Sequence, residues 1–354
     1  MRPFDVDRPV RFRAPARYHS RVRPMALALG SSLALASAAA FAGWWTVVRM
    51  PGRSVRGPLA PLSDDERAIR AGLEADVEAL AGGIGERHVF QPEALARAAD
   101  HVETTLRAAG LDVRREAFVA AGETCANLVA EIRGTARPDE IVVVGAHYDT
   151  VRGSPGADDN ASGVAALLAL ARRLAGRPAA RTVRLVAFAN EENPFHGTDE
   201  MGALVHARAA RARGDRITAM LALETLGYFD ARPGSQGYPF PFSVFYPDTA
   251  DFTAFVSRTE DRALVRRCVA AFRGAVEFPC EGAAPPAAIR GVSWSDHAAF
   301  WEAGYPAAMA TNTAFFRNER YHRPDDLPES LDLDRLARVV VGLEAVVADL
   351  ARAE

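Results

Sequence analysis

The sequence predicts an α/β fold, a three-layer α/β/α sandwich around a central mixed, mostly parallel sheet. Apolar runs of strand length alternate with longer stretches of helical periodicity along most of the chain, which is the pattern of a sheet covered by helices. Polar and acidic residues directly follow several of the strand-like runs, where open α/β sheets place their ligand sites. At 354 residues the chain is long enough for one large domain of this kind.

The expected elements begin with two amphipathic helices. Apolar residues recur at helical spacing over 64–80 and again over 92–109. The next two runs, 111–119 and 127–132, have the composition of strands. They precede a central strand, which starts with the four apolar β-branched residues 141–144.

The second half of the chain alternates between the two patterns more regularly. Because strands separated by helices tend to lie parallel, this half should supply the parallel part of the sheet. The expected elements are helices over 163–174, 201–213, 249–272 and 333–351, strands over 182–189, 217–223 and 306–310, and an ordered loop over 230–249 that is rich in Pro, Gly and aromatic residues.

The N-terminal part of the chain differs in composition from the rest. Residues 1–24 are polar and rich in Arg, whereas residues 25–48 are uncharged and rich in Ala and Leu, with Trp44 and Trp45 near their end. This pattern predicts a basic cytoplasmic leader and a transmembrane signal-anchor, with the remaining chain membrane-anchored on the extracytoplasmic side. A cleaved signal peptide, and with it a secreted or periplasmic protein, is the alternative, because small residues at 36–40 offer cleavage sites.

The rest of the chain reads as one domain behind a linker. Residues 49–63 are rich in Pro, Gly and Arg, so we expect a linker there and a folded domain over 64–354. The net charge of −3 gives no reason to expect a nucleic acid partner. Cys125, Cys268 and Cys280 form no C-x-x-C pair, which argues against a thiolate zinc site. Cys268 and Cys280 could form a disulfide in an oxidising compartment. The sequence does not indicate the oligomeric state.

The strongest chemical signal lies in residues 142–163, VVVGAHYDTVRGSPGADDNASG. A strand ends near His147, and a turn rich in Gly and Pro can fold back to bring Asp159 beside it. A neutral imidazole and a carboxylate suit zinc. Asp149, two residues beyond His147, can accept the second ring N–H of that histidine. The alternative is a buried histidine next to an acidic surface turn.

Three further clusters follow strands in the same way. Glu191 and Glu192 follow one strand, and two adjacent carboxylates can divide metal binding and proton transfer between them. Glu224 closes the apolar run MLALE, and Tyr321 and His322 lie in a loop after the last expected strand. These clusters should meet at one edge of the sheet, since each follows the carboxyl end of a strand.

Taken in order, the motifs HYDT, GADDNASG, NEEN, LETLGYF and SDH…YH resemble the co-catalytic zinc exopeptidase family. That family includes bacterial leucyl-type aminopeptidases, glutamate carboxypeptidases and glutaminyl cyclases. The resemblance covers residues 65–352. It implies a catalytic domain over 64–354 that acts on peptides and binds two zinc ions about 3.5–4 Å apart.

The resemblance also implies a set of metal ligands. Asp159 would bridge both zinc ions. Glu192 and His322 would complete one site, and His147 and Glu224 the other.

Further roles follow from the same resemblance. Glu191 would be the general base, which takes a proton from the metal-bridging water or hydroxide and passes it to the leaving amine. Asp149 would orient His147, and Tyr321 could donate a hydrogen bond to the oxyanion. Asp296, in the segment that reads S-D-H, is expected just outside the ligand set.

The chain departs from the family pattern at three points. Glu224 stands where many of the aminopeptidases carry Asp. The segment NPFHGTDEMG replaces a turn rich in Gly and Ser, and its His196 is expected to be solvated. Asn312 lies where an acid was half expected, so its role is open.

Three functions remain open from the sequence. The first is a zinc-dependent aminopeptidase, and the second is a glutaminyl-cyclase-like acyltransferase with a single zinc. The third is a catalytically silent binding domain. The intact set of five ligands together with Glu191 favours the first. The choice between amino- and carboxypeptidase and the preferred substrate residue are not decided by the sequence.

Overall fold

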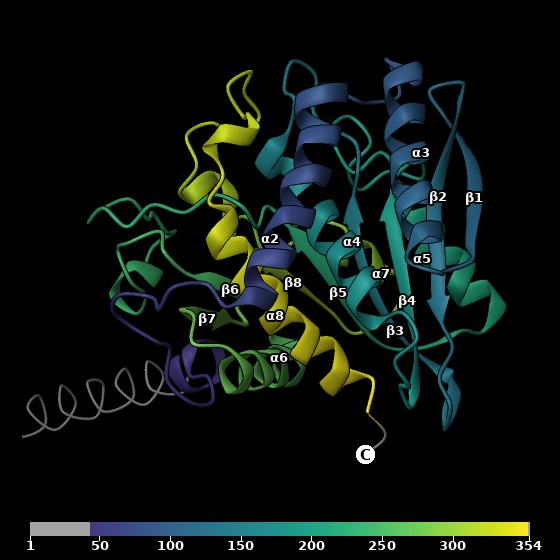
Figure 1. The fold of residues 1–354 in the computed structure, drawn as a ribbon. Helices are drawn as coiled ribbons and strands as arrows, with labels where there is room; N and C mark the ends of the chain where they lie inside the picture. The colour runs from purple at the N-terminus through teal and green to yellow at the C-terminus, as the bar shows by residue number, and fades with distance from the viewer. Residues whose placement is uncertain (1–42, 353–354) are drawn as a thin grey trace, which may run out of the picture. The chain divides into compact units, whose positions relative to one another are not determined.

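The sheet at the centre of the molecule is mixed, as the sequence predicts. The computed structural model describes residues 43–352, and from Thr46 onward they form one compact unit. Its eight strands lie in the order β1-β2-β4-β3-β5-β8-β6-β7 (Figure 1). The pairs β3–β4, β3–β5, β5–β8 and β6–β7 are parallel, whereas β1–β2, β2–β4 and β6–β8 are antiparallel. The strands are β1 (Val113–Ala120), β2 (Glu123–Ile132), β3 (Arg137–His147), β4 (Arg181–Phe188), β5 (Arg216–Glu224), β6 (Thr253–Val256), β7 (Cys280–Ala283) and β8 (Ala307–Thr311).

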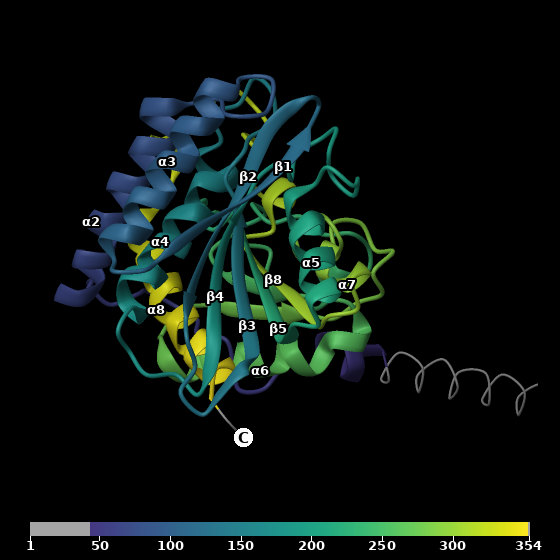
Figure 2. The same cartoon turned by 90° about the vertical axis from the view of Figure 1, so that its right-hand side faces the viewer.

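Helices cover both faces of this sheet, so the predicted three-layer sandwich is confirmed. Figure 2 shows α2, α3, α4 and α8 on one side and α5 and α7 on the other. Alternate residues of β3 enter the two apolar cores: Val142 and Val144 join the first, and Ile141 and Val143 the second. The helices are α2 (Asp64–Val77), α3 (Pro92–Ala108), α4 (Gly163–Leu174), α5 (Gly202–Arg213), α6 (Arg262–Ala275), α7 (His297–Glu302) and α8 (Leu333–Leu350), with a π-helical turn η2 (Glu78–Ile84) after α2.

The parallel strands end at the same edge of the sheet. In the register of the central strands, His147 of β3 pairs with Phe188 of β4, and Glu224 of β5 pairs with Thr311 of β8. The residues that follow these strands therefore start from neighbouring positions, although they lie far apart in the sequence. This register brings the candidate site residues together.

The segment 249–272, expected to be mostly helical, is helical only in its second half. Its first part forms β6, and α6 begins at Arg262. The residues TAFV of β6 are β-branched, aromatic or small, and they pair with β8 on one side and β7 on the other. Tertiary pairing thus decides the structure of this short run. The four-residue strand β7 and the six-residue helix α7 were not expected from the sequence.

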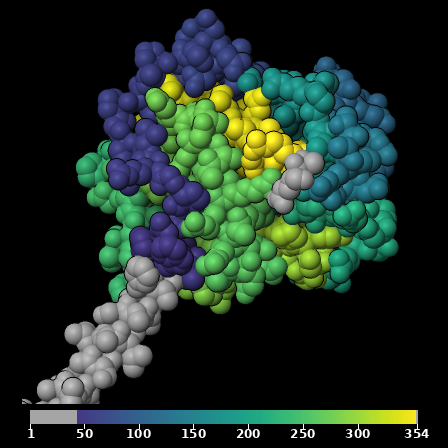
Figure 3. All heavy atoms as spheres, turned by 90° about the horizontal axis from the view of Figure 1, so that it is seen from below, coloured from purple at the N-terminus to yellow at the C-terminus, as the bar shows by residue number. Residues whose placement is uncertain are grey.

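The predicted linker is an ordered strap on the surface of the domain. Arg273 of α6 donates to the carbonyl of Pro51 at 2.8 Å, and the hydroxyl of Ser54 accepts from the backbone N–H of Cys280 at 3.0 Å. Figure 3 shows this N-terminal segment, in purple, lying along the green surface formed by the middle of the chain. The strap ends at Ser63, which caps α2 together with Glu66.

The structure of the described residues contradicts the prediction of a membrane anchor. Among residues 43–352 no helix is both long and apolar enough to cross a bilayer. The described end of the predicted span forms the π-helix η1 (Trp44–Val48), which has 5 residues, whereas a spanning helix needs about 20. The predicted leader, 1–24, and residues 25–42 of the span lie outside the described residues. The membrane location deduced from that span is accordingly not supported.

All three cysteines are buried and free, so Cys268 and Cys280 are not joined by a disulfide. Burial raises the pKa of the Cys268 thiol to about 12, which keeps it protonated and unreactive.

Two glycines in neighbouring helices are expected to respond oppositely to alanine. A Cβ on Gly342 of α8 would clash with the ring of Phe272, which is fully buried in α6, whereas a Cβ on Gly274 of α6 would meet nothing within 4 Å. Gly342→Ala should lower the free energy of unfolding by about 1–3 kcal/mol through overpacking. Gly274→Ala should raise it by up to about 1 kcal/mol through helix propensity. Urea titrations of both variants measure the two changes, and equal effects of the same sign would contradict the packing argument.

Candidate metal centre

The candidate site lies at the carboxyl ends of β3, β4, β5 and β8. His147 is the last residue of β3 and Glu224 the last of β5. Asp159 lies in the π-helical turn η3 (Ala157–Ser162), which precedes α4. Glu192 follows β4, and His322 lies in the loop after β8. All five predicted ligands therefore meet at one edge of the sheet.

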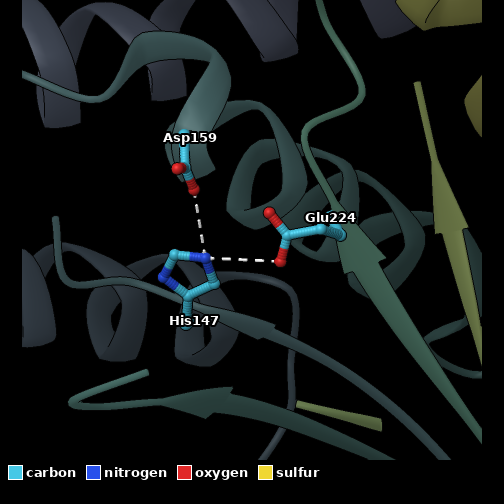
Figure 4. A group of neighbouring side chains, drawn as sticks. All are labelled: His147, Asp159 and Glu224. Carbon is cyan, nitrogen blue, oxygen red and sulfur yellow. Dashed lines mark ion pairs between the residues drawn. The ribbon is translucent and has the colours of Figure 1, made fainter. Parts of the chain in front are cut away.

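The first group of candidate ligands consists of His147, Asp159 and Glu224. The Nε2 atom of His147 lies 3.2 Å from Oδ1 of Asp159 and 3.4 Å from Oε2 of Glu224. Figure 4 shows one ring nitrogen of His147 facing both carboxylates. All three residues are buried, and their ligand atoms lie within 4.8 Å of one another.

The second group consists of Asp159, Glu192 and His322. The Nε2 atom of His322 lies 3.0 Å from Oδ2 of Asp159 and 3.2 Å from Oε2 of Glu192. Asp159 belongs to both groups, and each of its two oxygens faces a different histidine. The carboxylate of Asp159 thus stands between two neighbouring three-residue groups.

Hydrogen bonds to the backbone hold Asp159 in this position. The carboxylate of Asp326 accepts from the N–H groups of Asp158 at 3.0 Å and Asp159 at 3.1 Å. The side chain of Asn160 donates to the carbonyl of Leu223 at 2.8 Å, which ties η3 to the end of β5.

Asp158 itself is buried and accepts from Asn312 through both of its oxygens at 3.0 Å. This contact gives Asn312 a structural role that the sequence did not reveal.

Asp149 supports the glutamate pair as well as His147. Its two oxygens accept hydrogen bonds from the backbone N–H groups of Glu191 at 3.1 Å and Glu192 at 3.2 Å. Its Oδ1 atom lies 3.5 Å from Nδ1 of His147, which is long for a strong hydrogen bond. The predicted contact of Asp149 with His147 is therefore the weaker of its interactions.

Several polar atoms in the two groups are buried and lack a hydrogen-bond partner among the described residues. They are Nδ1 and Nε2 of His147, both oxygens of Asp159, Oε1 of Glu192 and Nε2 of His322. Buried polar atoms without partners are costly unless an ion or water satisfies them. Imidazole nitrogens and carboxylate oxygens are the ligands that zinc prefers at catalytic sites. The donor set therefore fits a pair of divalent cations that share Asp159.

The pKa values of these groups reflect the negative charge that is crowded into the site. Burial and the nearby charge of Asp159 raise the pKa of Glu192 to about 8. Burial likewise raises the pKa of Glu224 to about 7, and the charges of Asp159 and Glu191 act in the same direction. Burial opposes the charged form of His322, but contacts with Asp159 and Glu192 raise its pKa to about 11. Bound cations would relieve the repulsion between the carboxylates. Protons would compete with these cations for the same carboxylate and imidazole groups.

Three further predicted residues line the space beside the ligands. Glu191 is buried next to Glu192, with His196 2.8 Å from its Oε1 atom. Tyr321 stacks on the ring of His322 at 3.8 Å, and burial raises the pKa of its hydroxyl well above the usual value. Asp296 precedes α7, and neither of its buried carboxyl oxygens has a hydrogen-bond partner among the described residues.

An apolar cavity opens next to Glu224 and Tyr321. Its walls come from segments far apart in the sequence, among them the aromatic loop expected over 230–249. The lining includes Tyr238, Phe242, Trp294, Met309 and Phe315. A cavity of this kind beside the ligands provides room for an apolar side chain of a substrate.

This sandwich, with two histidine–carboxylate groups at its strand ends, defines a metallo-exopeptidase. The chain belongs to peptidase family M28, whose family model matches residues 127–347. It is 38% identical over 280 residues to the uncharacterised protein YfbL of Escherichia coli K12, covering 77% of this chain and 85% of that one. It spans about half the length of two further relatives that it matches, a probable zinc metalloprotease of Pyricularia oryzae and a probable leucine aminopeptidase of Arthroderma otae.

Solved structures show the same fold. A zinc aminopeptidase from Bacillus subtilis superposes with a TM-score of 0.62 at 15% identity, over 80% of this chain and 95% of that one. A glutaminyl cyclase from Fimbriiglobus ruber superposes with a TM-score of 0.59 at 18% identity, over 85% and 99% of the two chains. At these identities the likeness establishes the fold alone, and both kinds of activity occur on it.

The structure also places beside the candidate site three residues that the sequence analysis does not assign to it. His196, expected to be solvated, contacts Glu191. The hydroxyl of Ser295 donates to Oε2 of Glu224 at 2.7 Å. The carboxylate of Asp326 holds the backbone of η3. In the sequence, the feature that points to Asp326 as a site residue is its position four residues after His322.

His297, next to Asp296, is expected to make stability depend on pH. Burial lowers its pKa to about 4, its Nε2 contacts the carbonyl of Val292 at 2.7 Å, and its Nδ1 has no partner among the described residues. Because the folded pKa lies below the unfolded value of about 6.5, unfolding takes up a proton between these values. Stability is therefore lost as pH falls from 6.5 toward 4, by up to about 3 kcal/mol.

The variant His297→Gln provides the matched comparison, since its amide can donate to Val292 but does not titrate. Urea unfolding of both proteins at pH 7 and pH 5, at one zinc concentration, measures the difference. The wild-type protein should lose more stability than the variant. Equal losses would show that His297 does not titrate in this range.

Proposed function

We propose that this protein is a two-zinc aminopeptidase, which hydrolyses the N-terminal peptide bond of peptides. The observation that carries the proposal is that two three-residue ligand groups share Asp159, while Glu191 lies beside them. His147, Asp159 and Glu224 would hold one zinc ion, and Asp159, Glu192 and His322 the other. The bound ions would supply Lewis-acid polarisation of the scissile carbonyl and of the attacking water.

The protein's own residues divide the remaining work. Glu191 is the proton carrier: its carboxylate takes a proton from the attacking water and delivers it to the leaving amine. Tyr321 remains protonated because burial raises its pKa, so its hydroxyl is available to donate a hydrogen bond to the developing oxyanion. Asp149 fixes the backbone of the glutamate pair, and Asp326 fixes η3.

The many carboxylates in the site favour a substrate that presents an N-terminal amine over one that presents a C-terminal carboxylate. Besides burial, the charges of Glu191 and Glu224 raise the pKa of Asp296, and the charges of Asp159 and Glu191 raise the pKa of Glu224. A substrate ammonium group would lower this repulsion, whereas a carboxylate would add to it. The apolar cavity beside Glu224 would then receive the side chain of the N-terminal residue, so bulky apolar residues are the expected substrates.

A single-zinc glutaminyl cyclase would need only one of the two ligand groups. Here the group of His147, Asp159 and Glu224 is complete, which favours the aminopeptidase. Elemental analysis of the purified protein, together with assays on peptides of differing N-terminal residue, tests the proposal. Two zinc ions per chain with release of N-terminal residues is the expected result. One zinc ion with cyclisation of N-terminal glutamine would establish a cyclase, and neither metal nor turnover would indicate a binding domain.

A further inference from the structure

His196 makes a direct contact with the carboxylate proposed to carry the proton. Its Nδ1 atom lies 2.8 Å from Oε1 of Glu191. The imidazole side chain is 28% exposed and the glutamate side chain 10% exposed, so the pair is at the border between the site and solvent. The contact engages Oε1, one of the two carboxylate oxygens of Glu191.

The loop that carries His196 is anchored on both sides of it. Phe195 is buried and stacks on Phe90 at 5.9 Å. The N–H of Phe195 donates to the carbonyl of Glu192 at 2.9 Å, and the N–H of Thr198 donates to the carbonyl of Phe195 at 2.9 Å. These contacts fix the backbone on both sides of His196, and they therefore keep its imidazole close to Glu191.

The charge of the pair supports a lasting contact. The hydrogen bond with Glu191 raises the pKa of His196 to about 9, although burial acts in the opposite direction. A cationic imidazole donates a short, charge-assisted hydrogen bond to a carboxylate, and such bonds restrict the orientation of both partners. Other histidines pair with acids away from the site, as His101 does with Asp76 at 3.1 Å.

We propose that His196 is a positioning residue, which holds the Glu191 carboxylate in the orientation needed for proton transfer through a hydrogen bond to Oε1. The inference rests on the proposed role of Glu191. It assigns no metal ligand and no substrate contact to His196. Loss of the hydrogen bond should allow the carboxylate to rotate, and misplacement of a catalytic group by about 1 Å can cost on the order of 100-fold in rate.

Two substitutions separate the hydrogen bond from mere filling of space. His196→Leu removes the donor, whereas His196→Asn retains an N–H donor close to the position of Nδ1. His196→Leu should lower kcat by about 10–100-fold, with KM and zinc content unchanged, and His196→Asn should keep most of the activity. His101→Leu is the matched control, because His101 is similarly exposed, at 26%, and is also paired with an acid. It should leave kcat unchanged.

Comparison with Glu191→Gln distinguishes failure of this inference from failure of the proposed function. If Glu191→Gln retains turnover, the proposed role of Glu191 is wrong. If that variant is inactive while His196→Leu matches the wild type, His196 does not position Glu191. A loss of zinc or of folded protein in both His196 variants would also overturn the inference, since it would show a structural role. In the double variant, removal of His196 should lower kcat no further.

Discussion

Glu191→Gln is expected to abolish turnover while the protein keeps its zinc. Gln has the size of Glu and can still accept the hydrogen bond from His196 through its amide oxygen, but it cannot take up a proton. General acid–base catalysis contributes about 100- to 10,000-fold to rate, so kcat should fall by that factor. Zinc content and the affinity for a competitive inhibitor should change little, because Glu191 belongs to neither ligand group.

Measurement of kcat, KM and zinc stoichiometry on the same preparation tests this expectation. Asp199→Asn is a suitable control, since Asp199 lies in the same loop, is 84% exposed and pairs with Arg208 on the surface. It removes one negative charge from the loop without touching the site. A Glu191→Gln variant with wild-type kcat would exclude Glu191 as the proton carrier.

Asp159→Ala is expected to remove both zinc ions and all activity. Its two oxygens face the two ligand groups separately, Oδ1 toward His147 and Oδ2 toward His322. The substitution leaves each group with one histidine and one glutamate, which is too few ligands for tight binding of zinc. Zinc content should therefore fall from the proposed two ions per chain toward none.

Glu224→Ala and His322→Ala are the graded controls, because each removes a ligand from one group only. Each should lower the zinc content by about one ion per chain, measured by elemental analysis after dialysis against zinc-free buffer. Circular dichroism would confirm that the variants remain folded. Full zinc content in Asp159→Ala would contradict the shared role of this residue.

The candidate site could be predicted largely from the sequence because its parts follow strands. His147, Glu192 and Glu224 end or follow strands whose apolar runs are plain in the sequence. Parallel strands end at one edge, so polar residues at those ends must converge. Short elements were harder to predict. The sequence predicts the segment that contains β6 to be mostly helical, because the four residues of β6 carry too little periodicity to outweigh the helical pattern beside them.

The sequence by itself determined the layered fold, the strand ends and the set of histidines and carboxylates at those ends. Local periodicity records which face of an element is buried, and this decides the fold class. Only the tertiary structure decided which partner each polar group found: His196 on Glu191, Asp149 on the backbone of the glutamate pair, and Asp326 on η3. It also packed the strap of residues 49–63 onto α6 and β7. The physical reason is that each of these hydrogen bonds depends on how the backbone of the folded chain is packed, and no local pattern in the sequence encodes that packing.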